Sequence, residues 1–270
     1  MGTRFFGERI RRREDPRLLT GAGRYTADLA TPDALHVAVL RSPHAHARIR
    51  SLEVSAARPA PGVALVATAA DLGPAARPFP LLIPNPNLRP RMPSALARDE
   101  VHYVGEPVAA VVARDRYAAE DALDLIRVDY EVLPAVADPL TALEPGAPLV
   151  HDGLDSNLAA RLVQAIGDAE AAFRRADVVI RERFPVCRGG GAAMEGRVVL
   201  AQWDPRAGKL AVWSSTQVPH LVRRVIADLL DLPEHAIRVA APDVGGAFGA
   251  KLVCYSEDVL VPRVLPGAKS

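Results

Sequence analysis

A glycine-rich loop near the end of the printed sequence is the segment best suited to hold a ligand. Residues 244–251 read VGGAFGAK. Glycines lack a Cβ atom, so they let the backbone approach a ligand closely and adopt positive φ angles. The spacing excludes a Walker A loop, because Ala250 separates Gly249 from Lys251, and it does not fit the G-x-G-x-x-G dinucleotide motif. An ordinary tight turn after a strand is the alternative interpretation.

A second polar turn lies upstream of this loop. Ser215, Thr216 and Gln217 stand just before Pro219, and proline is favoured at the first position of a helix. The Gln217 side-chain amide can donate a hydrogen bond to a ligand oxygen, and a helix N-terminus favours negative charge nearby. The alternative is a turn glutamine that faces water. If the two turns meet in the fold, both can direct N–H groups at one ligand.

The other groups that could do chemistry do not form a recognisable site. His44 and His46 share a face if they lie on a strand, but no third and fourth metal ligand stands at a suitable spacing, so we interpret them as part of a turn. Cys187 and Cys254 form no C-x-x-C pair, which excludes an iron–sulfur or zinc site made by this chain's thiolates alone. We expect two free thiols, no protein metal ligands and no catalytic triad.

Composition and charge exclude several classes of protein. The chain has 270 residues, of which 49% are hydrophobic, and a formal net charge of +1. These values are typical of a globular protein with a buried core, and they give no electrostatic reason to expect nucleic acid or an anionic membrane as a partner. No run of about 18 apolar residues is present, so no membrane-spanning helix is predicted. The three arginines at 11–13 are followed by charged residues rather than an export signal, so we expect a cytoplasmic protein.

Patterns of strands and helices must position the two turns. Strand–helix–strand runs next to separate antiparallel hairpins favour an α+β fold over a doubly wound sheet. Proline-rich residues 77–93 predict an irregular loop, and we expect one domain over 1–145 and a second over 146–270. The predicted strands are 35–40, 63–67, 107–112, 127–132, 177–184, 198–203, 210–214 and 237–241, and the predicted helices are 117–126, 168–176 and one that begins at Pro219.

Several segments follow one another in an order typical of a known family. The first domain resembles the a/b hammerhead domain of the xanthine dehydrogenase and aldehyde oxidase family in RREDPRLLTGAGRYTADL (12–29), LHVAVLRSPHAHARIRSLEVSAARPAPGV (35–63) and HYVGEPVAAVVARDRYAAEDALDLIRVDYEVLPAVADP (102–139). Residues 200–252 resemble the start of that family's molybdopterin-binding domain. The resemblance covers nearly the whole chain.

This resemblance implies part of a molybdenum hydroxylase large subunit, an oxidoreductase that hydroxylates an aldehyde or N-heterocycle with oxygen derived from water. The implied cofactor is molybdenum–molybdopterin in a dinucleotide form, with 2Fe–2S clusters and FAD on partner subunits. By residue match, Gln217 would donate to the apical oxo group of molybdenum. Gly246, Ala247, Phe248 and Gly249 would line the cofactor. The pterin holds the metal, which agrees with the expectation of no protein ligands.

Departures from the family pattern concern the later part of the chain. The family's subunit is much longer, and its general-base glutamate is expected beyond the end of this chain, so we expect no catalytic residue here and a truncated second domain. The alternative function is an inactive remnant or assembly module. A further partner would be a separate C-terminal half of the large subunit. Leu252 stands where some purine-oxidising members have an acidic residue, which argues against purines.

Two structural expectations follow from this truncation. Pro262 and Pro266 are expected to break the helix that the family pattern predicts after Tyr255. The apolar stripe of the helix at 219–230 is expected to lack partners and to form an exposed patch.

Overall fold

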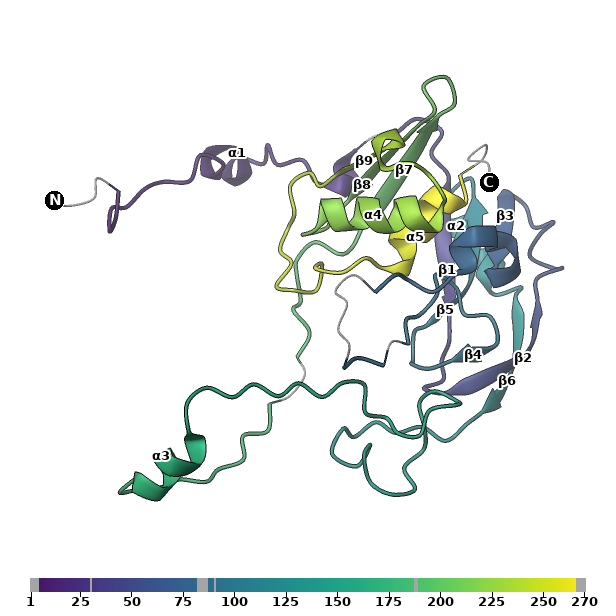
Figure 1. Ribbon diagram of the computed structural model, residues 1–270. Coiled ribbons are helices and arrows are strands. Elements are labelled where there is room, and N and C mark those ends of the chain that lie inside the picture. The colour runs from purple at the N-terminus through teal and green to yellow at the C-terminus, as the bar shows by residue number, and fades with distance from the viewer. Residues whose placement is uncertain (1–4, 30, 82–86, 90, 187–188, 266–270) are drawn as a thin grey trace. The chain divides into compact units, whose positions relative to one another are not determined.

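The computed structural model describes residues 5–29, 31–81, 87–89, 91–186 and 189–265 of the chain (Figure 1). These residues form two compact units. The larger unit consists of residues 35–191 with 228–231, and the smaller unit of residues 1–34, 192–227 and 232–269. Helices and strands occur together in both, which confirms the α+β class. The division at residue 145 stays a prediction.

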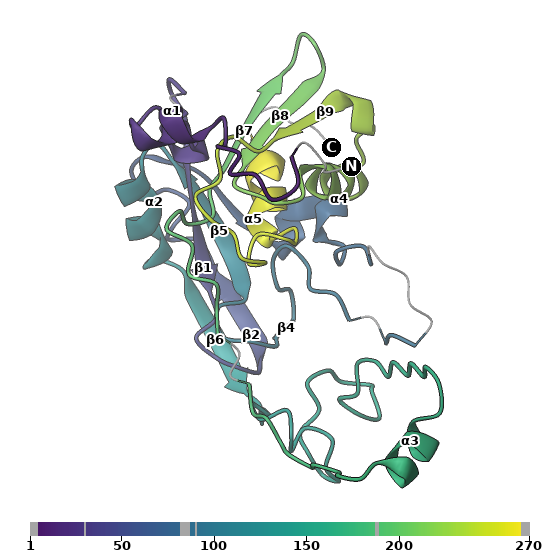
Figure 2. The ribbon, with the colours of Figure 1, turned by 90° about the vertical axis from the view of Figure 1, so that its left-hand side faces the viewer.

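Two three-stranded antiparallel sheets form the framework of the larger unit (Figure 2). The first has the strand order β1-β5-β3 and the second the order β4-β2-β6. The bounds are β1 His36–Arg41, β2 Ala47–Glu53, β3 Val63–Thr68, β4 Glu100–Val101, β5 Pro107–Ala113 and β6 Arg127–Val132. The structure therefore confirms the strands predicted at 35–40, 63–67, 107–112 and 127–132.

Strand β5 is the centre of the larger unit's core. It pairs with β1 on one side and β3 on the other, and all of its residues are buried. A strand covered on both faces reads as the continuous apolar run PVAAVVA rather than as an alternating pattern. Helix α2 (Arg116–Leu123) packs against β1 and β5. The Asp115 carboxylate caps this helix by accepting the Ala118 N–H at 2.8 Å.

The smaller unit is built on a hairpin and a crossover. Strands β7 (Val199–Asp204) and β8 (Lys209–Ser214) are antiparallel, and β9 (Ile237–Ala240) runs parallel to β8. Helix α4 (Pro219–Leu229) makes the connection that a parallel pair requires, and α5 (Ser256–Arg263) packs against β7 and β8. The remaining helices are α1 (Asp15–Leu19), α3 (Ala169–Arg175) and the 3₁₀ helices Thr26–Asp28, Ala69–Ala76 and Glu234–Ala236.

One predicted strand does not form. Residues 177–184 lie outside any strand of the structure, although the preceding helix α3 is present as predicted. Val178, Ile180 and Phe184 are 76%, 82% and 80% exposed. The prediction was wrong because a β-type sequence needs a neighbouring strand, and no strand among the described residues pairs with this segment.

Two expectations about the smaller unit were also wrong. Helix α5 runs through Pro262 to Arg263, and Val264 still donates to the Leu260 carbonyl. Pro262 stands in the last turn, where one lost hydrogen bond interrupts little of the helix; Pro266 lies outside the described residues. The apolar stripe of α4 is covered, since Val222, Val225 and Ile226 are buried.

None of the described helices combines the length and apolar character that crossing a bilayer requires.

Candidate cofactor site

The structure brings the two polar turns together within the smaller unit. The Gln217 backbone N–H donates to the Lys251 carbonyl at 2.9 Å. The Thr216 hydroxyl donates to the same carbonyl at 3.3 Å. The turn that leads into α4 is therefore joined directly to the end of the glycine loop, as the hypothesis of one shared ligand requires.

A buried ion pair fixes the shape of the glycine loop. Lys251 is only 3% exposed, and its ammonium group donates to Glu195 Oε2 at 2.7 Å. The same oxygen accepts the Gly245 N–H at 2.8 Å, and the Glu195 N–H donates to the Gly245 carbonyl at 3.1 Å. One carboxylate thus holds both ends of the loop.

Three glycines and one phenylalanine give the loop its backbone course. A Cβ atom on Gly245 would lie 2.6 Å from Glu195 Cβ, a separation that no side chain tolerates. The φ angles of Gly246 and Gly249 are +95° and +86°, in the region that glycine enters without steric cost. Phe248 has a φ of +51°, which is uncommon for a bulky residue and marks a local strain of order 1–3 kcal/mol.

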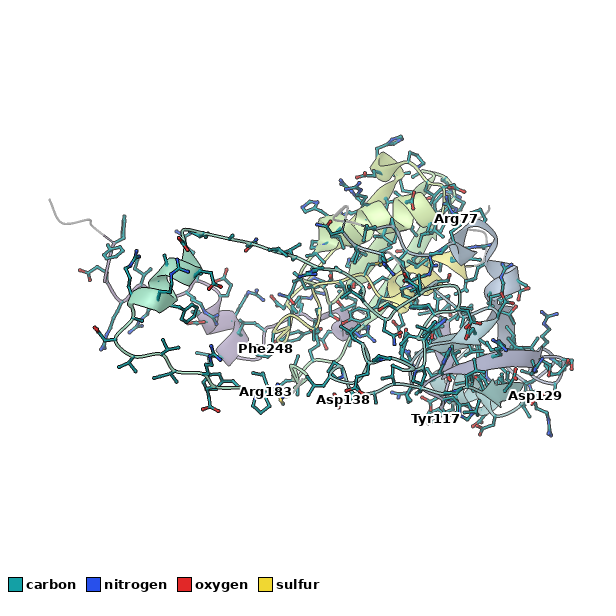
Figure 3. The ribbon with its side chains drawn as sticks, turned by 60° about the horizontal axis from the view of Figure 1, so that its bottom comes forward. Arg77, Tyr117, Asp129, Asp138, Arg183 and Phe248 are labelled. Carbon is teal, nitrogen blue, oxygen red and sulfur yellow. The ribbon has the colours of Figure 1, made fainter. Side chains whose placement is uncertain are left out.

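The tip of the loop presents N–H donors. Among the described residues, no atom accepts a hydrogen bond from the backbone N–H of Gly246, Ala247, Phe248 or Gly249. Phe248 is 77% exposed, and Figure 3 labels it at the surface; Gln217 is exposed as well. Successive N–H groups in a backbone with positive φ angles form an anion-binding concavity. This arrangement suits a ligand rich in oxygen acceptors.

Residues at the start of α5 form hydrogen bonds with β8, which precedes the Gln217 turn, and with the glycine loop. The Ser214 hydroxyl donates to Asp258 Oδ1 at 2.7 Å, and the Tyr255 N–H donates to Asp258 Oδ2 at 2.9 Å. Burial raises the pKa of the Asp258 carboxyl above its ordinary value. The Tyr255 hydroxyl donates to the Ala250 carbonyl, and the Arg197 guanidinium lies 3.6 Å from the centre of the Tyr255 ring.

The entrance to the loop is held by the N-terminal segment. Asp243 forms a bidentate ion pair with Arg17 and accepts the Arg24 N–H at 2.8 Å. These hydrogen bonds lower the pKa of the Asp243 carboxyl to about 2. The Asp243 N–H in turn donates to the Arg24 carbonyl at 3.0 Å. The course of the loop therefore depends on residues from both ends of the chain.

Sequence reasoning found the turns but missed the residues that hold them. Glu195 contacts Gly245 and Lys251, and Asp258 contacts Ser214, all far away in sequence, so no local pattern indicates these contacts. The available signal for Glu195 was a lone acid in the small-residue run GGGAAMEG at 189–196. Its second oxygen, Oε1, is buried and has no partner among the described residues. Cys254 is a free thiol whose pKa is raised by burial, and Cys187 lies outside the described residues.

Comparison with known protein families gives two matches in consecutive order. Residues 20–134 match the model described as aldehyde oxidase and xanthine dehydrogenase, a/b hammerhead domain. Residues 150–264, which contain the glycine loop, match the molybdopterin cofactor-binding domain.

Similar proteins and a similar crystal structure agree with these matches. The chain is 38% identical to the carbon monoxide dehydrogenase large chain of Afipia carboxidovorans, over 93% of this chain and 32% of the relative. It is also 38% identical to the nicotine 6-hydroxylase large subunit of Paenarthrobacter nicotinovorans, over 95% of this chain and 31% of the relative. The crystal structure of quinoline 2-oxidoreductase from Pseudomonas putida 86 superimposes with a TM-score of 0.84 at 41% identity, over 93% of this chain and 32% of that one.

The chain thus spans about a third of the length of these relatives (31–32%). The two domain matches, their order and the shared fold lead to one conclusion. The chain belongs to the xanthine dehydrogenase and aldehyde oxidase family and comprises a hammerhead domain and a molybdopterin cofactor-binding segment of its large subunit.

Proposed function

We propose that this chain is part of a molybdenum-dependent oxidoreductase that hydroxylates an aldehyde or N-heterocycle with oxygen derived from water. One observation carries the proposal. A loop with N–H groups directed at no described acceptor lies beside the exposed Gln217 amide, inside the region that matches the molybdopterin cofactor-binding domain. Molybdopterin is rich in oxygen and carries negative charge, so the residues present fit this cofactor.

Each residue of the site has a proposed task. Gln217 would donate its side-chain amide to an oxygen of the cofactor, and the backbone of Gly246, Ala247, Phe248 and Gly249 would line it. Glu195 and Lys251 position the loop through their bonds to each other and to Gly245. When bound, the cofactor supplies the oxygen-transfer and redox chemistry. The protein contributes orientation and hydrogen-bond donors that need no rearrangement.

Partners and further cofactors follow from the relatives. The names of the similar proteins describe them as a large chain, a large subunit and a subunit of a dehydrogenase complex. We therefore propose that this chain works with an iron–sulfur subunit carrying 2Fe–2S clusters and with an FAD subunit, and that its molybdopterin is a dinucleotide. The free Cys254 thiol agrees with a reducing compartment such as the cytoplasm.

A further partner would cover the segment that contains residues 177–184. In Figure 3, the labelled Arg183 lies on an extended stretch whose side chains project outward. Neighbouring apolar side chains on this stretch are exposed: Leu162, Val163, Ile166, Val178, Ile180, Phe184 and Val186. Exposed apolar side chains that recur from Leu162 to Val186 are typical of an interaction surface. We propose that its partner is the polypeptide corresponding to the rest of the relatives' length, either continuous with this chain or separate from it.

The decisive experiment measures metal content in the assembled complex. The chain is co-expressed with the polypeptide for the remaining two-thirds of the large subunit and with the two partner subunits, in a host that makes molybdopterin. Elemental analysis should find molybdenum at about one atom per complex. A well-folded complex without molybdenum would overturn the proposal. Metal without turnover of any aldehyde or N-heterocycle would favour the alternative, an inactive assembly module.

A matched pair of variants tests the loop itself. Gly245→Ala introduces a methyl group at 2.6 Å from Glu195 Cβ, so we expect at least about a tenfold loss of bound molybdenum. Gly196→Ala adds the same methyl group in open space and should leave the metal content unchanged. Equal metal content in the two variants would contradict a cofactor role for the loop.

A further inference from the structure

A cluster of imidazole and carboxylate groups lies in the larger unit, where two short stretches of chain meet. His46 directly precedes β2, Glu100 begins β4, and His102 directly follows β4. The antiparallel register pairs Ala47 with Val101, so His46 and His102 continue that register and face each other. The ligand-type neighbours of His46 are Glu100 and His102, which the spacing around His46 in the sequence does not indicate. Sequence spacing missed them because they come from a different strand.

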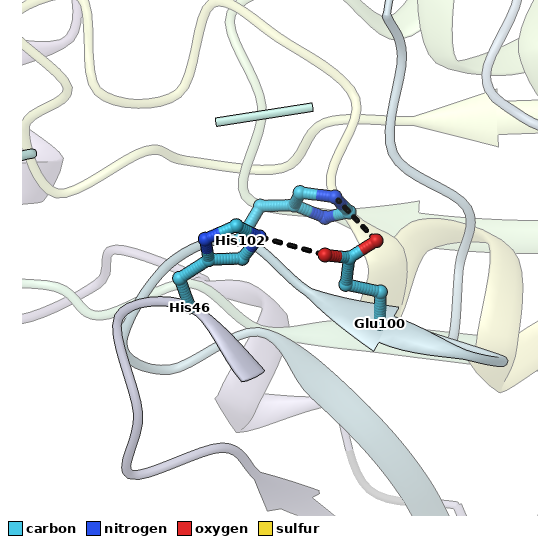
Figure 4. Close-up of side chains that lie close together, drawn as sticks. All are labelled: His46, Glu100 and His102. Atoms are coloured by element: carbon cyan, nitrogen blue, oxygen red, sulfur yellow. Dashed lines mark hydrogen bonds and ion pairs between the residues drawn. The ribbon is translucent and has the colours of Figure 1, made fainter. Parts of the chain in front are cut away.

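The three side chains converge on one point. Figure 4 shows each oxygen of the Glu100 carboxylate directed at one imidazole ring. Glu100 Oε1 lies 2.7 Å from His46 Nε2, and Glu100 Oε2 lies 3.8 Å from His102 Nε2. One ligand atom from each residue lies within 4.8 Å of the other two. Ligands on a tetrahedral zinc ion with bonds of about 2.0–2.1 Å are about 3.4 Å apart, so shifts of about 1 Å complete the site.

The hydrogen bond of His46 to Pro134 leaves its Nε2 directed at Glu100. His46 Nδ1 lies 2.9 Å from the Pro134 carbonyl oxygen, which can only accept, so Nδ1 carries the hydrogen. In the neutral ring, Nε2 then presents a lone pair toward Glu100 Oε1, which has lone pairs of its own. Two lone pairs at 2.7 Å repel unless a proton or a metal ion lies between them.

Neighbouring groups orient the rings as they do around metal ions in proteins. A metal-bound histidine almost always donates its other N–H to a carbonyl or a carboxylate. The Pro134 carbonyl does this for His46. For His102, the carboxylate of Glu106, which is 4% exposed, lies 3.8 Å from Nδ1. Both rings therefore have Nε2 left for a metal.

A fourth ligand is close by. The His151 ring lies 4.4 Å from the His102 ring, measured between their centres. His102 retains partial exposure, so an ion in solvent can reach the group. Imidazole nitrogens combined with a carboxylate oxygen are typical ligands of zinc and of similar divalent ions, whereas calcium and magnesium prefer oxygen alone.

We propose that His46, Glu100 and His102 bind a divalent transition-metal ion such as Zn²⁺, with His151 or water as the fourth ligand. The ion would act as a structural clamp. Strand β4 is short, and its pairing with β2 involves only the register pairs Ala47 with Val101 and Arg48 with Glu100. A metal ion bridging His46 to Glu100 and His102 would fasten the two strands more firmly than those pairs alone. This proposal does not depend on the molybdenum site.

The test uses the full chain without an affinity tag, stripped with a chelator and then titrated with Zn²⁺ or Mg²⁺. Zn²⁺ should raise the Tm and bind with a stoichiometry of one in calorimetry, while Mg²⁺ should not. Glu100→Gln and His102→Ala should each weaken Zn²⁺ binding by at least about tenfold, and Glu106→Gln by about tenfold or more through ring orientation. His220→Ala, which removes an exposed imidazole from α4, is the matched control and should change nothing.

Co²⁺ provides a readout that does not depend on stability. Bound at His46, Glu100 and His102, it should give the intense visible absorption of a four-coordinate ion, and this absorption should vanish in Glu100→Gln. Zn²⁺ affinity that is equal in wild type, Glu100→Gln and His102→Ala would overturn the proposal. So would the absence of Zn²⁺ binding by the folded wild-type chain, which would leave a proton as the cation between His46 and Glu100.

Discussion

The glycine loop at 244–251 and the segment at 158–186 (the extended segment, which also contains α3) differ in how they are held. The loop is tied by hydrogen bonds to Glu195, Thr216 and Tyr255, all within the smaller unit. The extended segment carries large apolar side chains that are mostly exposed. The first region has its shape determined by contacts within this chain. The second has a sequence suited to burial, but its large apolar side chains are not covered by the described residues. The difference agrees with the two proposals: the loop, already held in place, would bind a cofactor, and the exposed apolar segment would bind a companion polypeptide.

The largest effect should come from breaking the buried ion pair. Lys251→Met leaves the Glu195 carboxylate buried without its cation, so we expect the free energy of unfolding to fall by about 3–5 kcal/mol. Urea titration of the full chain measures this loss. The double variant Glu195→Gln with Lys251→Met removes both charges and should recover most of it. A loss below about 1 kcal/mol for Lys251→Met would mean that the loop is not held by this pair.

A smaller effect is expected from the support beneath the Gln217 turn. Ser214→Ala removes the hydroxyl that donates to the buried Asp258 carboxyl, which should cost about 1–3 kcal/mol. Ser256, the first residue of α5, is also buried but has no such bond to Asp258, so Ser256→Ala serves as the control. The measurement is the shift in denaturation midpoint, and equal shifts in the two variants would count against the proposed support.

The contact at the loop entrance should show itself as a dependence on pH. Because the pKa of Asp243 is depressed to about 2, folding favours its ionised form. The stability from this group is fully present above the ordinary carboxyl pKa of about 4 and is lost as the pH falls toward 2. Asp243→Asn should therefore be less stable than wild type at pH 6, and the difference should narrow steadily below pH 4. A difference that stays constant across this range would exclude the mechanism.

The smallest effect on stability is expected in the extended segment. Replacing Val178, Ile180 and Phe184 together by serine should change the unfolding free energy by no more than about 0.5 kcal/mol, because these side chains are exposed. The same variant should lose affinity for the proposed companion polypeptide in a pull-down with purified components. Tyr117→Ser, at an exposed aromatic on α2 labelled in Figure 3, is the control and should bind normally. Unchanged binding by the triple variant would remove the proposed docking surface.

Sequence patterns predicted those features whose cause is local. The apolar run of β5 and the proline that opens α4 both act through near neighbours in the chain. The meeting of Gln217 with the glycine loop was expected only from the family resemblance, since nothing in either turn specifies the other.

Features that depend on distant residues escaped prediction. Glu195 has its function through Gly245 and Lys251, and His46 has its partners in Glu100 and His102. Residues 177–184 show the opposite error, in which a sound local β pattern lacks a neighbouring strand. A periodic sequence indicates which side chains of a segment are suited to burial. It does not indicate whether another part of the protein lies against them.

The arrangement in which one carboxylate grips both ends of the glycine loop has a thermodynamic consequence. Glu195 closes residues 245–251 into a ring of non-covalent bonds. The loop therefore loses its conformational entropy when the chain folds, and not when a ligand binds. Such a preformed receptor pays little ordering entropy on association. The loop should accordingly have nearly the same backbone conformation with and without a bound ligand.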